Sequence, residues 1–235
     1  MDKLTVVIPV YNEEEVIEEV INDWNDHLKG IDANYKIKIY NDGSKDNTLA
    51  KLHEIQSKLG SQIVIVDKPN SGHGPTVLKS YLDSLDADWL FQVDSDNEIA
   101  ASYFKEFWKH RNEVDLVIGR RLGRQSPAFR KLMTSGSAFL VKVLYGAGIP
   151  DVNVPYRLMR VSAFKSHIQR INKDVFVPNI IVSGIAAKYK MRIKILDIEY
   201  VYRTTGVSTL DSNVGKLLKI SQRCIADVVK FVFQK

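Results

Sequence analysis

The sequence predicts an α/β fold in which helices cover both faces of a mostly parallel β-sheet. In the first 120 residues, short apolar, β-branched runs alternate with segments that carry apolar residues at helical spacing. The runs are apolar at nearly every position, which is typical of parallel strands buried on both faces. With 235 residues, 45% of them hydrophobic, the chain can bury a large core. We therefore expect one large α/β domain with a small C-terminal appendage.

Each of the first three expected strands is followed by a loop and a helix. The expected strands in this half of the chain lie at 4–10, 37–40, 62–67 and 89–94. Helical spacing follows the first three at 16–24, 49–59 and 77–85, and Asp46 or Asn47 can cap the second helix. This alternation predicts a parallel sheet.

The second half of the chain is expected to add further strands and helices. Strands are expected at 115–119 and 192–203, a loop passing into a short strand at 151–160, and helices at about 135–145, 179–190 and 214–233. The last helix carries apolar residues along one face with lysines and arginines nearby. It either packs onto the domain or lies on an anionic membrane surface.

Polar clusters follow the first four expected strands, at 11–13, 42–44, 71–74 and 94–98. In open α/β sheets, ligands bind outside the carboxyl ends of the strands. The sequence therefore predicts that the four clusters form one site. The third cluster contains Gly72 and His73 and enters a helix N-terminus, where backbone N–H groups favour anions.

Asp94 and Asp96 follow a buried strand, and a turn at Ser95 lets both carboxylates face one metal ion. Two carboxylates suit Mg²⁺ or Mn²⁺, and either ion readily bridges to diphosphate oxygens. Aspartates at this spacing also cap helices or lie on solvated loops. The interpretation as a metal site therefore depends on the surrounding motifs.

Three motifs occur in order, each associated with an expected strand: TVVIPVYNEEE at 5–15, NDGSKDNT at 41–48 and QVDSDNE at 92–98. With them the chain resembles the family-two glycosyltransferases of the Rossmann-like GT-A fold, and within these the dolichol-phosphate mannosyltransferase and polyprenyl-phosphate glycosyltransferase branch. The resemblance spans residues 4 to about 208. It implies an enzyme that transfers a sugar from a nucleotide-sugar donor with the help of Mg²⁺ or Mn²⁺.

The resemblance also implies roles for individual residues. It makes Asp94 and Asp96 the metal ligands and Glu98 a further metal contact, and it has Asp42 hydrogen-bond the base of the donor. Read without it, Asp42 and the following Gly43 can also be a simple turn. The residues expected to bind the donor are Pro9, Tyr11, Glu13, Asp42, Gly72, His73, Asp94, Ser95 and Arg203.

The basic stretch after residue 119 is expected to serve the acceptor. Relatives use arginines in this region near an acceptor phosphate, which makes Arg120 and Arg130 candidate catalytic residues, although a solvated basic loop is the alternative. A polyprenyl phosphate acceptor is already ionised at neutral pH and needs no general base. A saccharide hydroxyl needs a carboxylate to take its proton, and Asp151 is then the first candidate. Its segment departs from the family pattern, with Val-Pro-Tyr at 154–156 in place of a Ser-Gly-Phe-like turn.

The chain is accordingly divided into a nucleotide-sugar-binding half at 1–119, an acceptor-binding half at 120–210 and a C-terminal amphipathic helix at 211–235. The first 119 residues hold 12 Lys and Arg against 22 Asp and Glu, a net charge of −10. The remainder holds 21 against 6, a net charge of +15, which favours an anionic partner such as a membrane face.

Composition also bears on the compartment and on other functions. The single cysteine, Cys224, cannot form an internal disulfide. No signal peptide opens the chain, and no apolar run reaches the length of a membrane span. We therefore expect a cytoplasmic protein that can also bind peripherally to the cytoplasmic face of the membrane. The missing P-loop lysine and G-x-G-x-x-G pattern weaken kinase, ATPase and dehydrogenase interpretations. A nucleotidyltransferase lacks its basic glycine-rich signature here, the intact D-x-D disfavours a non-catalytic sensor, and no nucleic-acid-binding motif is recognisable.

Overall fold

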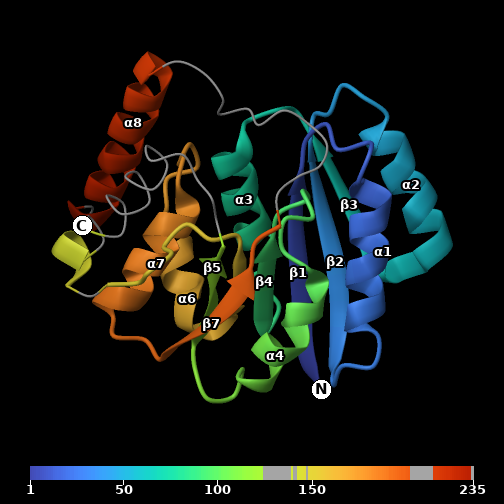
Figure 1. Ribbon diagram of the computed structural model, residues 1–235, viewed down its shortest axis with the longest axis horizontal. Helices are drawn as coiled ribbons and strands as arrows, with labels where there is room; N and C mark the ends of the chain where they lie inside the picture. Colours follow the sequence, from blue (N-terminus) through green and yellow to red (C-terminus); the bar gives the residue numbers. More distant parts are fainter. Residues whose placement is uncertain (124–138, 140–141, 147, 202–213, 234–235) are drawn as a thin grey trace.

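The computed structural model describes residues 1–123, 139, 142–146, 148–201 and 214–233. Over these residues the chain forms a seven-stranded sheet in the order β3-β2-β1-β4-β6-β5-β7 (Figure 1). The strands are β1 Asp2–Val10, β2 Ala33–Asp42, β3 Ile63–Lys68, β4 Trp89–Val93, β5 Leu116–Leu122, β6 Tyr156–Arg160 and β7 Ile193–Glu199. Each expected strand is found, β5 runs three residues further than expected, and β7 ends at Glu199, short of the expected 203, with 202 and 203 outside the described residues.

The sheet is mostly parallel, as expected. Strands β3, β2, β1 and β4 run parallel to one another, and so do β5 and β7. Only β6, among the described strands, is antiparallel, and it pairs with β4 on one side and β5 on the other. Because β1 to β4 are parallel, their carboxyl ends lie at the same edge of the sheet.

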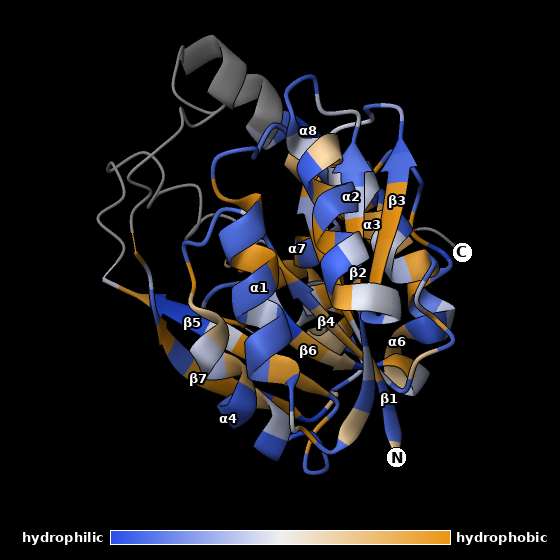
Figure 2. Cartoon of the chain, turned by 90° about the vertical axis from the view of Figure 1, so that its right-hand side faces the viewer, coloured by the Kyte–Doolittle hydropathy of each residue, from blue (hydrophilic) through white to orange (hydrophobic). Residues whose placement is uncertain are grey.

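Helices cover both faces of the sheet (Figure 1). They are α1 Ile17–Leu28, α2 Thr48–Leu59, α3 His73–Leu82, α4 Phe104–Lys109, α6 Val161–Ile168, α7 Pro178–Lys188 and α8 Val214–Phe233, with short 3₁₀ turns at Gly60–Gln62 and Ala101–Tyr103. Helices α3, α6 and α7 pack against one another on one face, and α1 and α4 lie on the other. Figure 2 shows the hydrophobic residues gathered in the strands and on the helix faces turned towards them.

An aromatic cluster fixes α1 and α4 on their face of the sheet. The ring of Phe91 in β4 lies 5.2 Å from Trp24 of α1, 5.0 Å from Phe104 of α4 and 4.8 Å from Tyr156 of β6, measured between centroids. All four rings are buried. Tilted and edge-to-face aromatic pairs contribute more stability than their buried area alone, so this cluster holds α1 and α4 against the centre of the sheet.

The helices at 16–24, 49–59 and 179–190 are found within a few residues of their expected limits, and α8 has its expected limits. Helix α3 begins at His73, four residues before its first expected apolar residue, so the last two residues of the third polar cluster, His73 and Gly74, form its first turn. Of the helix expected at 135–145, only 139 and 142–145 are described. The sequence reading missed α4 and α6, which are only six and eight residues long and carry too few turns for a clear helical period.

One face of α8 packs onto the domain. Val228 is fully buried, the backbone N–H of Phe176 donates to Asp227 at 2.7 Å, and the guanidinium of Arg223 donates to the Asp174 carbonyl at 3.1 Å. Over these residues the helix therefore packs onto the domain, which is the first of the two placements expected for it. No helix in the described ranges is long and apolar enough to cross a membrane.

Candidate functional site

The loops that follow β1 and β2 are joined at the carboxyl edge. The backbone N–H of Asn12 donates to Ser44 Oγ at 3.0 Å, and the N–H of Lys45 donates back to Asn12 Oδ1 at 2.8 Å. Next to them the N–H of Glu13 donates to Thr48 Oγ1 at 2.9 Å. Pro9 lies at the end of β1, and the side chain of Tyr11 is exposed on the rim. The first two polar clusters are thus brought together as predicted.

Asp42 ties the second cluster to the third. Its carboxylate is buried and accepts hydrogen bonds from the backbone N–H groups of Ser71 at 2.8 Å and Gly72 at 2.9 Å. The ammonium of Lys68 also donates to it, and continues to Thr76 at 3.0 Å. Burial raises the pKa of Asp42, but the hydrogen bonds from Lys68 and Ser71 outweigh it and hold the pKa below its usual value. Asp42 is therefore ionised and holds the backbone at Ser71 and Gly72 in place, so it is more than a turn residue.

Two glycines near this carboxylate have positive φ angles, and the one at Gly43 fits the tight turn expected there. Gly43 has φ +66°, and an added Cβ would lie 2.8 Å from the backbone nitrogen of Asn70. Gly72 has φ +90° and immediately precedes α3. Both positions are in the left-handed region that favours glycine, so the backbone of the two loops can approach the carboxylate of Asp42.

We expect Asp42→Ala to weaken binding of a nucleoside diphosphate by about 1–3 kcal/mol, the cost of leaving polar partners unpaired. Calorimetric titration measures this directly. Asp67→Asn is the matched control, because Asp67 is an exposed carboxylate on the adjacent strand that accepts from Asn41 and, among the described residues, makes no hydrogen bond to the loop at 69–72. Unchanged affinity in the Asp42 variant would show that this carboxylate only shapes the loop.

Asp94 and Asp96 lie just beyond β4, on the same edge. The side chain of Asp94 is 24% exposed, and its Oδ1 lies 3.9 Å from His73 Nε2 at the start of α3. Burial raises the pKa of Asp94 to about 6; the charge of His73 opposes this rise and the nearby carboxylate of Asp96 adds to it. Ser95 between them is buried, and Asp96 Oδ1 accepts the backbone N–H of Glu98 at 3.2 Å. Asp94 therefore faces the start of α3, and Asp96 lies close enough to Asp94 to raise its pKa.

The pair of carboxylates suits Mg²⁺ or Mn²⁺. These ions commonly bind through one or two carboxylates and complete their shell with water and substrate phosphates, and two adjacent carboxylates with a raised pKa at one of them match that requirement. In the described part of the chain, however, no three His, Cys, Asp or Glu side chains converge as a metal site. The role of Glu98 as a further metal contact therefore stays a prediction.

The adjacent arginines of β5 have different partners. Arg121 forms a two-bond ion pair with Asp151 at 2.7 and 2.9 Å, and each of these side chains is only 9% exposed. Arg121 is close enough to Asp94 to oppose the rise in its pKa. Arg120 instead pairs with Asp197 at 2.6 and 2.8 Å, since successive strand residues point to opposite faces.

This arrangement revises the expectations for the acceptor half. The structure brings Arg121, rather than the predicted Arg120, towards the pair of aspartates. Both oxygens of Asp151 are occupied by Arg121, so Asp151 is not a free general base. Two other candidates, Arg130 and Arg203, lie outside the described residues.

Sequence reasoning assigned no role to two polar residues at or behind this edge, Lys68 and Gln92. Lys68 follows the apolar run of β3 and looks like an ordinary surface lysine, and Gln92 is a single amide within the apolar run of β4. The signal available for Gln92 was its spacing, because a residue two before Asp94 on a strand points to the same side.

Comparison with known proteins identifies the family and the fold. The family model described as glycosyl transferase family 2 matches residues 5–168. Undecaprenyl-phosphate 4-deoxy-4-formamido-L-arabinose transferase of Proteus mirabilis is 24% identical over 212 residues, which cover 89% of this chain and 64% of that protein. The chain thus spans slightly less than two thirds of the length of this curated relative.

Two solved structures share the fold. Glucosyl-3-phosphoglycerate synthase of Mycobacterium tuberculosis, in complex with Mn²⁺, UDP-glucose and phosphoglyceric acid, has a TM-score of 0.68 and 15% identity, with 98% of this chain and 80% of that chain covered. TarS of S. aureus, in complex with UDP-GlcNAc, has a TM-score of 0.65 and 19% identity, with 97% and 66% covered. The expected GT-A fold is confirmed. Since the family model covers well over half of its residues, this chain belongs to glycosyl transferase family 2.

Proposed function

We propose that this chain transfers a sugar from a nucleoside-diphosphate sugar to an acceptor, with inversion at the anomeric carbon, and that Asp94 and Asp96 hold a divalent cation at the diphosphate. The observation that carries the proposal is the single edge on which Asp42 organises two loops beside these two carboxylates. The Mn²⁺ and UDP-sugars named in the complexes of the two solved relatives support this choice of cofactor and donor.

In this proposal each group at the edge has a separate task. Asp42 and the loop that it holds receive the base, and the N-terminus of α3 with its backbone N–H groups faces the diphosphate. A Mg²⁺ or Mn²⁺ ion held by Asp94 and Asp96 would supply stabilisation of the negative charge on the departing diphosphate. Arg121, kept in place by Asp151, adds a fixed positive charge near the same point. An acceptor oxygen then bonds to the anomeric carbon as the bond from that carbon to the diphosphate oxygen breaks.

The proposed acceptor is a polyprenyl phosphate. An ionised phosphate attacks without a general base, which agrees with the engagement of Asp151 by Arg121. The name of the relative from Proteus mirabilis gives undecaprenyl phosphate as its own acceptor, which supports the same class here. A saccharide hydroxyl, the alternative acceptor, would require another carboxylate to take its proton.

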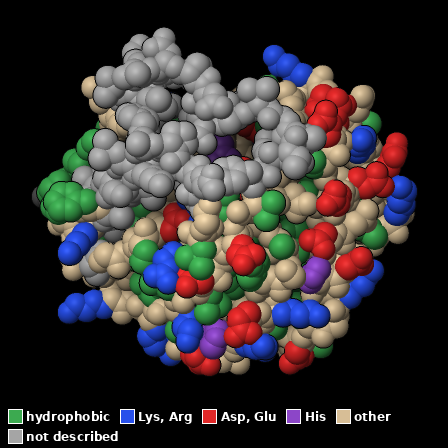
Figure 3. All heavy atoms as spheres, in the orientation of Figure 1, with side chains coloured by type: hydrophobic (Ala, Val, Ile, Leu, Met, Phe, Trp, Pro, Cys, Tyr) green, Lys and Arg blue, Asp and Glu red, His purple; other side chains and the backbone are tan. Residues whose placement is uncertain are grey.

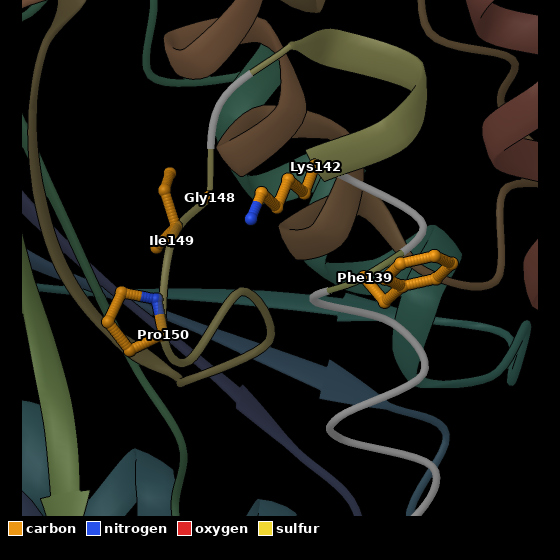
Figure 4. Close-up of a pocket in the computed structure, with 5 residues that line it drawn as sticks. All are labelled: Phe139, Lys142, Gly148, Ile149 and Pro150. Carbon is orange, nitrogen blue, oxygen red and sulfur yellow. The ribbon is translucent and has the colours of Figure 1, made fainter.

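A pocket in the second half of the chain also supports a lipid acceptor. It has a volume of 310 Å³ and is lined by Phe139, Lys142, Gly148, Ile149 and Pro150. Figure 4 shows Lys142 extending from its helix towards Gly148 and Ile149, and the side chain of Phe139 is 67% exposed. An ammonium group among apolar side chains suits an anionic amphiphile at a membrane surface. Figure 3 shows that acidic side chains gather instead over α1 and α2, at the right of the view.

We expect the protein to float with anionic liposomes at low salt, to lose this binding at high salt, and to prefer undecaprenyl or dolichyl phosphate over free sugars in a transfer assay. Lys142→Glu should weaken liposome binding about tenfold, since each basic residue near an anionic surface contributes about 1 kcal/mol. Lys58→Glu on the acidic side is the matched control, because Lys58 is an exposed lysine that pairs with Glu18. A protein that ignores liposomes at low salt and glycosylates a soluble hydroxyl would contradict the lipid acceptor.

A further inference from the structure

Behind Asp94 lies a buried chain of polar side chains to which neither the sequence motifs nor the family match assigns a role. Gln92 in β4 and Tyr81 in α3 are fully buried, and Asn179 at the start of α7 is 4% exposed. Resting on the proposed function, we infer that Gln92 is a positioning residue: its amide orients Asp94 so that one carboxylate oxygen is presented to the cation and the diphosphate.

The hydrogen bonds along this chain run in one direction. The Tyr81 hydroxyl donates to Asn179 Oδ1 at 2.6 Å, Asn179 Nδ2 donates to Gln92 Oε1 at 3.0 Å, and Gln92 Nε2 donates to Asp94 Oδ1 at 3.0 Å. An ionised carboxylate can only accept, so Gln92 must turn its Nε2 towards Asp94. Gln92 Oε1 then accepts from Asn179 Nδ2, which leaves Asn179 Oδ1 to accept from Tyr81. The Tyr81 hydroxyl also lies 3.3 Å from Gln92 Oε1. Flipping either amide would break two hydrogen bonds in a dry interior, which fixes the donor that faces Asp94.

The chain distinguishes the two oxygens of Asp94. Gln92 occupies Oδ1, and no group in the described ranges donates a hydrogen bond to Oδ2. Since the side chain is still 24% exposed, Oδ2 is the oxygen left for a ligand at the edge. A hydrogen bond to the outer side of a metal-binding carboxylate holds its orientation and tunes its affinity.

The other end of the chain is anchored in rigid elements. Tyr81 belongs to α3 and Asn179 to α7, which pack together on one face of the sheet (Figure 1). The backbone carbonyl of Asn179 also accepts from the buried guanidinium of Arg157 at 2.9 Å. The orientation of Asp94 is therefore set by two helices and not by its own loop, as a precise site requires.

The test compares Gln92→Met, which keeps a similar length and removes both hydrogen-bonding groups, with wild type. We expect the affinity for Mn²⁺ in the presence of UDP, followed by the electron paramagnetic resonance signal of free Mn²⁺, to fall about tenfold, with a similar fall in kcat. Binding of UDP in excess chelator should stay within about twofold, because Asp42 does not contact this chain. Ser80→Ala is the control: its hydroxyl is equally buried on α3 and bonds only to the Val77 carbonyl.

Tyr81→Phe provides a second test, which still applies if Gln92→Met fails to fold. It retains the ring and removes only the first donor, and we expect a smaller loss of Mn²⁺ affinity, about threefold. If whichever variants fold bind Mn²⁺ within the range set by Ser80→Ala, the inference is overturned while the proposed function stands. If wild-type protein binds no Mn²⁺ with UDP and transfers no sugar, the proposed function fails and the inference fails with it.

Discussion

Asp94→Asn and Asp96→Asn are each expected to lower metal-dependent sugar transfer by about 10²- to 10³-fold, the scale for removing one preorganised charge-stabilising group. An amide carries no charge and binds Mg²⁺ or Mn²⁺ poorly, so the departing diphosphate loses its counter-charge. The fold should be retained, because neither carboxylate belongs to the hydrophobic core. Steady-state transfer rates with saturating Mn²⁺, together with Tm, measure both effects.

The stability of the Asp94 variant adds a second readout. Burial raises the pKa of Asp94 to about 6, so its ionised form is less favourable in the folded protein than in the unfolded chain. At a pH above about 6, Asp94→Asn in metal-free buffer should therefore have a Tm no lower than that of the wild type. Asp83→Asn, which changes a surface carboxylate paired with Lys79 far along α3, is the control and should keep wild-type activity. Full activity in either Asp94→Asn or Asp96→Asn would refute the metal assignment.

Arg157→Met is expected to give the largest loss of stability, about 3–5 kcal/mol. The guanidinium is fully buried and donates to the backbone carbonyls of Val154 at 2.6 and 3.1 Å, Val152 at 3.2 Å and Asn179 at 2.9 Å. Methionine fills much of the space but removes these donors. The Val152 carbonyl keeps the Ser183 hydroxyl as a donor at 2.7 Å, whereas the Val154 carbonyl loses both guanidinium donors, and each carbonyl left unpaired costs about 1–3 kcal/mol. For a domain of this size, a fall in Tm of about 10 °C or more follows.

Arg192→Met is the matched control for this change. Arg192 makes a comparable set of hydrogen bonds to Asp115 but its side chain is 59% exposed, and exposed ion pairs contribute about 0–1 kcal/mol. Urea denaturation of both variants gives the two free energies of unfolding. Similar losses in the two variants would show that the buried carbonyls around Arg157 find other donors.

Much of the fold could be predicted because its strands are local signals. The apolar runs of β1 to β4 each lie between clear turns, and the polar residues after them identify the edge that carries the site. The position of β6 could not be predicted. It pairs antiparallel between β4 and β5, and that order depends on contacts between residues far apart in the chain, such as Phe91 with Leu158.

The candidate site could likewise be predicted only in part. Asp42, Asp94 and their loops follow from motif order, whereas the distinction between Arg120 and Arg121 depends on which face of β5 meets Asp151. Neither arginine differs from the other in the sequence pattern. Gln92 was hidden for a related reason, since its partners come from α3 and α7, nearly a hundred residues apart in the case of Tyr81 and Asn179.

The most direct measurement of the central claim is sugar transfer from a panel of nucleoside-diphosphate sugars, with release of the nucleoside diphosphate monitored in Mn²⁺ and in excess chelator. We expect one donor to be consumed in Mn²⁺, the rate to fall to background in chelator, and activity to return when Mn²⁺ is restored. Turnover that is undiminished in chelator would contradict the cation at Asp94 and Asp96. No consumption of any donor, by protein that is folded by Tm and supplied with lipid phosphate and saccharide acceptors, would contradict the account as a whole.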